Sequence, residues 1–196
     1  MSQTVERRNS HTLRSLAFVA LAFVAACRPA SGPPSPQPGV QAAQPAVIHA
    51  SEGERRLLPG GTPLLIKIDP LTTGSQRLVL GMLHLPPGEA IGVHRHMRED
   101  EIIIFTRGTA RVQLGTQLYT VGAGGAIFIP QGTCIAVTNV GTDTLSNYVV
   151  FSSPGFERSL RAVSSPAGEP PKVITPAERA AAFHEGHAVA NPSECR

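Results

Sequence analysis

The sequence predicts an all-β domain, an antiparallel sandwich or barrel of short strands, followed by a short helical tail. Two observations lead to this prediction. The 196 residues include 19 Gly and 18 Pro but no Trp and only two Tyr, which suits short strands with many turns better than a helical bundle. Between residues 62 and 153, short apolar runs alternate with glycine-containing connections, and no helical periodicity competes with them. The length allows one ordinary domain with additional segments at its ends.

Residues 1–26 have the features of an export signal. Three arginines precede an apolar run over residues 15–26, which is too short to span a bilayer but has the length of a signal-peptide core. Residues 24–27, Val-Ala-Ala-Cys, resemble the lipobox of bacterial lipoproteins. The resemblance implies that Cys27 is acylated and anchors the protein to a membrane of the bacterial cell envelope, on the periplasmic or outer-surface side. The alternative is an ordinary secretory signal cut nearby, which leaves Cys27 as a plain thiol.

Residues 27–47 are expected to form a tether between the anchor and the domain. This segment is rich in Pro, Ser, Gly and Gln and almost free of charge, so it lacks the apolar surface that folding requires. Without residues 1–26 the chain has 14 basic and 13 acidic residues. This balance gives no support for nucleic-acid binding, and the expected macromolecular contact is the membrane.

The predicted barrel covers residues 48–163, and the tail covers residues 164–196. Strands are expected at the apolar runs 64–68, 77–85, 102–105, 110–114, 118–121, 126–129, 135–139 and 145–151. Residues 156–163 are expected to form a short helix that closes the barrel. A second helix is predicted over about 176–187, because Thr175, Pro176 and Glu178 form a helix-start pattern with a capping threonine.

Two short motifs inside the strand-rich region resemble the cupin superfamily. The first motif is matched by Gly88, His94, His96, Glu101 and Gly108, and the second, in register, by Gly124, Pro130, Gly132 and Asn139. The resemblance covers roughly residues 62–153. It implies a double-stranded β-helix, or jelly roll, around a central pocket.

His94, His96 and Glu101 are the candidate metal ligands. Residues two apart on a strand point to the same face, so His94 and His96 both enter the interior, and two imidazoles aimed at one point favour a divalent metal. A turn after His96 lets Glu101 begin the next strand facing inward. Glu99 and Asp100 are competing carboxylates, but the turn placement and the family spacing both favour Glu101.

The fourth ligand position of metal-binding cupins falls on Ile135, which cannot coordinate a metal. The remaining two histidines and one carboxylate have the composition of a facial triad with open coordination positions, which suits Fe(II), Mn(II), Zn(II) or a similar ion. Cys134 is expected to face outward, and His84 is better explained as a surface or hydrogen-bonded residue than as a ligand. The alternative is a metal-free cupin whose two histidines are hydrogen-bonded pocket residues.

Other residues offer further candidates. His184 and His187 are three residues apart, but a solvated pair is a better interpretation than a second metal site. Cys134 and Cys195 are the only cysteines after Cys27, and the sequence leaves open whether they meet in a disulfide. A role as core or pocket wall is expected for four apolar residues, Met82, Ile103, Phe105 and Phe128.

A barrel of this kind does not by itself identify a reaction, because the family resemblance implies many different activities. We expect a small-molecule site in which the metal binds an oxygen-bearing substrate, with oxygenase chemistry as the first hypothesis. The second hypothesis is a non-catalytic binding lipoprotein without a tightly held metal, and the third is a partner-docking domain with a vestigial pocket. Whether the barrel forms a homodimer through its edge strands stays open.

Overall fold

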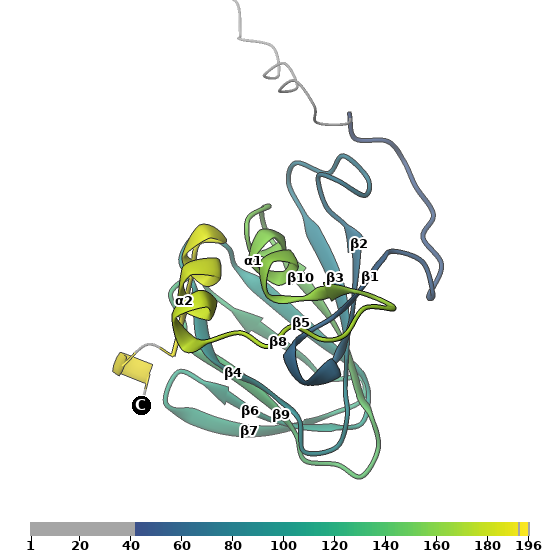
Figure 1. Cartoon of the computed structure of the whole chain (residues 1–196). Helices are drawn as coiled ribbons and strands as arrows, with labels where there is room; N and C mark the ends of the chain where they lie inside the picture. Colours follow the sequence, from purple (N-terminus) through teal and green to yellow (C-terminus); the bar gives the residue numbers. More distant parts are fainter. Residues whose placement is uncertain (1–41, 192, 196) are drawn as a thin grey trace, which may run out of the picture. The chain divides into compact units, whose positions relative to one another are not determined.

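The computed structural model describes residues 42–191 and 193–195 (Figure 1). The predicted export signal, Cys27 and most of the predicted tether therefore lie outside the described residues. The strands are β1 (Glu54–Leu57), β2 (Pro63–Ile68), β3 (Val79–Leu85), β4 (Ala90–His96), β5 (Glu101–Arg107), β6 (Thr109–Leu114), β7 (Gln117–Gly122), β8 (Ala126–Ile129), β9 (Ile135–Asn139), β10 (Leu145–Phe151), β11 (Ser165–Pro166) and β12 (Ala188–Ala190). The helices are α1 (Phe156–Val163) and α2 (Pro176–Glu185), with 3-10 turns at Pro59–Gly61 and Ser193–Cys195.

These strands form two antiparallel sheets. The larger sheet has the order β11-β1-β2-β3-β10-β5-β8, and the smaller has the order β12-β4-β9-β6-β7. The crossings between neighbours that are distant in sequence, such as β3 beside β10 and β4 beside β9, are those of a jelly roll. The predicted jelly-roll barrel with short C-terminal helices is confirmed.

Side-chain alternation places one apolar core between the sheets. Along β3 and β9, every second residue is buried, as expected for strands with one inward face. The largest fully buried apolar side chains come from both sheets: Leu64, Ile66, Val79, Leu85, Phe105, Val112, Ile129, Ile135, Leu145 and Phe151. The walls of the central pocket belong to this core.

The prediction that Phe128 belongs to the core or pocket wall was wrong. On β5, Glu101 and Ile103 point inward, whereas Ile102 points outward. Phe128 on β8 is the direct cross-strand partner of Ile102, and paired residues share one face of a sheet, so Phe128 also points outward and is 59% exposed. Because both faces of β5 carry isoleucines, the sequence does not reveal which face of β5, and therefore of its partner β8, points inward.

Gly108 turns the chain from β5 into β6. Its backbone has φ +83°, and a Cβ at this position would lie 2.9 Å from the Cα of Leu145. Both the positive φ and the close approach exclude a side chain. The last glycine of the first motif is therefore required by backbone geometry.

The two helices lie side by side over one end of the sheets (Figure 1). As predicted, α2 begins with a capping box: the Glu178 amide donates to Thr175 Oγ1 at 3.2 Å, and the Thr175 amide donates to Glu178 Oε2 at 2.7 Å. The helix ends at Glu185, two residues earlier than predicted, where Gly186 caps it. No helix in the described part of the chain is long and apolar enough to cross a membrane.

Arg161 fastens α1 to the larger sheet. Its Nη1 lies 2.6 Å from Oδ2 of the fully buried Asp69, and its Nε and Nη2 donate to Glu54 Oε2 at 2.8 and 2.6 Å. Burial by itself raises the pKa of the Asp69 carboxyl, but hydrogen bonds from Arg161 and Thr72 lower it overall. This ion-pair network fixes the position of α1 and therefore of the side chains that α1 presents to the pocket.

Two short strands from the predicted tail complete the sheets. β11 pairs with β1, and β12 pairs with β4. In the second pair, Ala188 lies opposite His96 and Ala190 lies opposite His94. The C-terminal segment therefore lies directly beside the strand that carries both candidate ligand histidines.

Candidate metal centre and pocket

The structure brings His94, His96 and Glu101 together. His94 and His96 point inward from β4 of the smaller sheet, and Glu101 points inward from the start of β5 in the larger sheet. The three residues are 5%, 2% and 3% exposed, and one ligand atom from each lies within 4.8 Å of the others. Within residues 42–191 and 193–195, this is the one cluster of three or more His, Cys, Asp or Glu side chains arranged to hold a metal ion.

The two competing carboxylates have other partners. Glu99 is fully buried, but its Oε1 lies 3.2 Å from Nδ1 of His187 in the C-terminal segment. Asp100 Oδ1 accepts a hydrogen bond from the backbone amide of Gln131 at 2.9 Å. The turn between β4 and β5 thus leaves only Glu101 facing the histidines.

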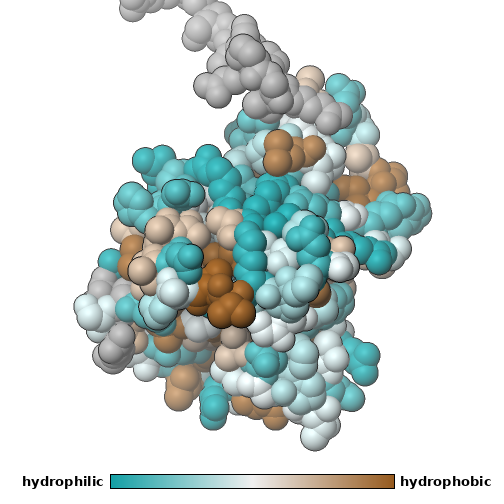
Figure 2. Space-filling view, viewed as in Figure 1, coloured by the Kyte–Doolittle hydropathy of each residue, from teal (hydrophilic) through white to brown (hydrophobic). Residues whose placement is uncertain are grey.

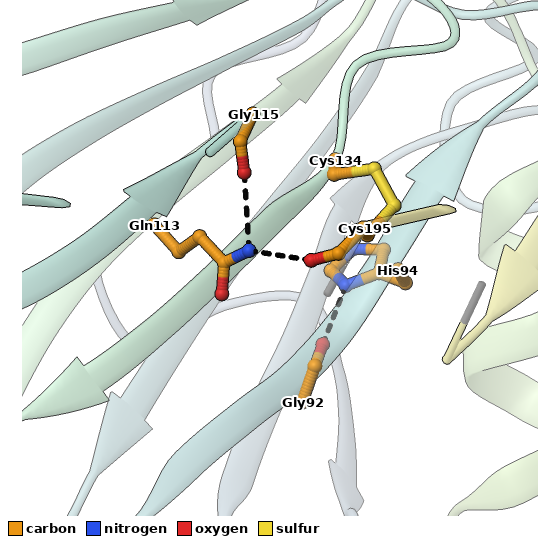
Figure 3. Close-up of a disulfide and its surroundings, with 6 residues drawn as sticks. All are labelled: Gly92, His94, Gln113, Gly115, Cys134 and Cys195. Atoms are coloured by element: carbon orange, nitrogen blue, oxygen red, sulfur yellow. Dashed lines mark hydrogen bonds between the residues drawn. A yellow bond between two sulfur atoms is a disulfide. The ribbon is translucent and has the colours of Figure 1, made fainter. Parts of the chain in front are cut away.

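One imidazole is held in a form that can bind a metal. His94 Nδ1 lies 2.8 Å from the carbonyl oxygen of Gly92 (Figure 3). Because a carbonyl only accepts, Nδ1 carries the proton, and the lone pair on Nε2 is left for a ligand. Burial, followed by the nearby His96, lowers the pKa of His94 to about 4, so this ring is neutral at neutral pH.

Unsatisfied polar atoms at the cluster show that these residues fit a cation. Both ring nitrogens of His96 and Oε2 of Glu101 are buried without a hydrogen-bond partner among the described residues. His96 Nε2 lies 3.4 Å from Glu101 Oε2, which is too long for a good hydrogen bond. Buried polar atoms in native proteins are almost always satisfied, and a divalent transition metal takes this combination of imidazole and carboxylate ligands. His94, His96 and Glu101 are therefore positioned to bind a metal.

The structure places no ligand at the fourth position. Ile135 lies directly opposite His94 in the pairing of β4 and β9, and its buried side chain lines the pocket. The neighbouring Cys134 forms a disulfide with Cys195. His84 is on the outer face of β3, where its Nδ1 lies 2.9 Å from the Ser146 hydroxyl.

Three phenylalanines pack against the two histidines, and we call Phe151, Phe156 and Phe183 the aromatic roof. The ring of Phe156, from α1, lies 4.3 Å from the ring of His96 and 5.8 Å from that of His94, centroid to centroid. Phe183, from α2, lies 5.8 Å from His94 and 5.2 Å from Phe156. Such contacts orient the imidazoles and keep water from their faces.

A cavity of about 330 Å³ adjoins the cluster. Both sheets and both helices contribute to its mostly apolar wall, and its volume is at the lower end of the range for ligand pockets. His94 and Glu101 line it, together with five polar residues that sequence analysis did not identify: Thr62, Glu89, Asn147, Arg179 and Asn191. The surface on the helical side is largely hydrophilic, with an apolar patch beside α2 (Figure 2).

Besides the pairing of β12 with β4, two side-chain contacts join the C-terminal segment to the barrel. The disulfide joins Cys134, before β9, to Cys195, and Gln113 Nε2 donates to the carbonyl oxygen of Cys195 at 2.9 Å (Figure 3). The second is the contact between Glu99 and His187. His184 is exposed on α2, and among the described residues neither His184 nor His187 belongs to a cluster of three or more metal-ligating side chains.

Comparisons with known proteins agree with this architecture. A family model described as a cupin domain matches residues 81–151. A comparison with curated protein sequences finds no match. Among solved structures, the chain is similar to a predicted oxalate decarboxylase from Thermotoga maritima, with 21% identity, a TM-score of 0.50 and coverage of 55% of this chain and 99% of the other.

Two further similar structures are a polyketide cyclase, RemF, from Streptomyces resistomycificus, and an RmlC-like cupin from Shewanella frigidimarina. The first has 24% identity, a TM-score of 0.49 and coverage of 55% of this chain and 79% of the other. The second has 15% identity, a TM-score of 0.49 and coverage of 58% and 95%. The match to a cupin-domain model over residues 81–151 therefore falls on the part of the jelly-roll barrel that carries this cluster, and the solved structure from Thermotoga maritima shares the fold.

Proposed function

We propose that the protein binds a divalent transition metal through His94, His96 and Glu101 and uses it to hold a small, oxygen-bearing molecule in the adjoining pocket. The observation that carries this proposal is the buried cluster with unsatisfied ligand atoms at the wall of a 330 Å³ cavity. Iron(II), manganese(II) and zinc(II) are the ions that suit the ligand types.

Residues around the cluster orient the ligand histidines, exclude water and leave a coordination position free. The carbonyl of Gly92 fixes the orientation of His94, and the aromatic roof excludes water from the imidazoles. Ile135 leaves a coordination position free and presents an apolar surface to whatever enters the pocket. When bound, the metal would supply Lewis acidity or redox chemistry toward an oxygen-bearing ligand, and an oxygenase is the first activity to test.

The second candidate function is non-catalytic binding of a small molecule. The observation that favours it is Ile135 itself, because a missing fourth ligand weakens metal binding while leaving an apolar pocket intact. Ligand binding that survives chelation supports this candidate, whereas ligand turnover that requires the metal supports the first.

We further infer that the domain is held at a membrane of the bacterial envelope through Cys27. The lipobox resemblance supports this inference, and so does the disulfide between Cys134 and Cys195, because disulfides persist in oxidising compartments outside the cytoplasm. Mass spectrometry of the N-terminal peptide tests it: an acylated Cys27 is expected, and an unmodified Cys27 would contradict it.

The metal site is tested by elemental mass spectrometry of the purified full-length chain. We expect about one equivalent of a transition metal in the wild-type protein and none in His94→Ala/His96→Ala. The control is His184→Ala, which removes an exposed histidine from α2 and should leave the metal content unchanged. A wild-type protein that stays metal-free after incubation with Fe(II), Mn(II) and Zn(II) would overturn the proposal.

A further inference from the structure

The pocket contains an arginine whose guanidinium forms no direct ion pair with a carboxylate of the described residues. Arg179, the fourth residue of α2, is half-buried and lines the cavity. No hydrogen bond or ion pair joins its guanidinium to another side chain in the described part of the chain. A guanidinium facing an apolar cavity without a partner has lost part of its hydration, so an anionic ligand there would gain from pairing with it.

Arg179 shares its cavity with the candidate metal cluster. His94 and Glu101 line the same cavity, which has a volume of about 330 Å³. A small ligand in this cavity therefore lies beside both Arg179 and the cluster.

Asn147 supplies a second unsatisfied polar group in the same cavity. It lies on β10, where the pairing with β5 shifts register between Ser146 and Asn147. Its side chain is buried, 2% exposed, and its Oδ1 has no hydrogen-bond partner among the described residues. A buried amide oxygen of this kind needs a donor, which a hydroxyl or N–H group of a ligand can provide.

The charged residues that line the pocket indicate the charge of a ligand that would fit it. The charged groups that line the cavity are Glu89 at the rim, Glu101 and Arg179. With a divalent ion at the cluster, their sum is one positive charge, which a monoanion neutralises. A single planar guanidinium pairs with a carboxylate through two parallel hydrogen bonds. The apolar walls of the cavity suit a ligand whose other atoms are uncharged and mostly apolar.

We propose that the ligand is a small organic acid: an apolar molecule with one carboxylate, paired with Arg179, and a hydrogen-bond donor that reaches Asn147. This inference rests on the proposed function, because it assigns the ligand class of the same pocket. Arg179 lies in the C-terminal segment, beyond the residues 81–151 matched by the family model. The selectivity for an acid therefore belongs to this chain's own helical segment.

The test measures the binding of matched acids and amides by titration calorimetry. The probes are 3-(4-hydroxyphenyl)propanoate and 6-hydroxyhexanoate, each of which carries a hydroxyl donor for Asn147, together with their amides, and each acid and its amide have nearly equal shape. They are titrated into the full-length wild-type protein, Arg179→Gln, and the control Arg111→Gln, which removes the same charge from an exposed position of β6 outside the cavity. Each protein is measured both with Zn(II) and after chelation.

We expect at least one acid to bind the wild-type protein and Arg111→Gln on the order of tenfold more tightly than its amide. In Arg179→Gln, with an unchanged thermal midpoint, this preference should fall to within about twofold. Equal binding of acid and amide by the wild type, or a preference that persists in Arg179→Gln, would overturn the inference. So would the absence of binding by both acids up to about 10 mM.

The outcomes separate this inference from the metal proposal. If the wild-type protein holds no metal but shows an acid preference that depends on Arg179, the ligand class stands and the metal proposal fails. If His94→Ala/His96→Ala removes the metal while acid and amide bind alike, the metal proposal stands and the ligand class fails.

Discussion

Reduction of the disulfide between Cys134 and Cys195 should destabilise the domain by an amount that follows from the length of the loop it closes. The two cysteines are 61 residues apart in sequence. For a loop of this length, loss of the cross-link increases the chain entropy of the unfolded state by an amount worth about 4 kcal/mol at 25 °C. With a urea m-value of about 2 kcal/mol/M, the unfolding midpoint should fall by about 2 M.

The assay uses the Cys27→Ser background, because Cys27, Cys134 and Cys195 are the three cysteines of the chain. Urea unfolding is followed by circular dichroism with and without a phosphine reductant. The further variant Cys134→Ser/Cys195→Ser should unfold at the reduced midpoint whether or not the reductant is present. If reduction leaves the midpoint of the Cys27→Ser protein unchanged, the cross-link does not constrain the unfolded state.

Three further predictions concern the supports of the site. Arg161→Met should lower the free energy of unfolding by about 3 kcal/mol, because it leaves the buried Asp69 carboxylate without its cation; a loss in urea unfolding below about 1 kcal/mol would contradict this. In chelated protein, His94 has a pKa of about 4 in the folded state, below its ordinary 6.5. Between these two pH values the unfolded state binds a proton at His94 and the folded state does not. The free energy of unfolding should therefore be unaffected by His94 above pH 6.5 and fall by about 3 kcal/mol as the pH drops toward 4; His94→Gln should lack this decrease, and parallel pH profiles of the two proteins would refute it. Thr175→Ala should cost about 1 kcal/mol in urea unfolding, because α2 loses its capping hydroxyl, whereas Thr175→Ser should restore most of the stability and an unchanged midpoint in the alanine variant would count against the cap.

The parts of the fold that follow local rules could be predicted from the sequence. The alternation of residues along β4 placed His94 and His96 on one face, and the start of α2 was readable from Thr175, Pro176 and Glu178. The turn that brings Glu101 to the histidines was predicted from the motif spacing. These features depend on short stretches of chain, where side-chain type and position carry the information.

The features that sequence analysis missed depend on contacts between distant segments. β12 has three residues, too few for a strand pattern, and only its pairing with β4 makes it a strand. Phe183 and Arg179 reach the pocket because α2 folds back over the barrel, which no local pattern reveals. The disulfide between Cys134 and Cys195 could be named as an option, but the meeting of the two sulfurs is a property of the tertiary structure.

The aromatic roof has a consequence for rates as well as for affinity. Phe156 and Phe183 belong to two helices, and the C-terminal segment that carries Phe183 is tied to the barrel through Cys195. The helices cover one side of the cluster, so a bound ion can leave only through the pocket or when the helices separate from the sheets, and its residence time should rise as local opening becomes rarer. A site with three protein ligands, weaker at equilibrium than a site with four, can still retain its ion through slow exchange. In this protein, slow opening of the helices and the disulfide would then help to retain the ion, although Ile135 contributes no fourth ligand.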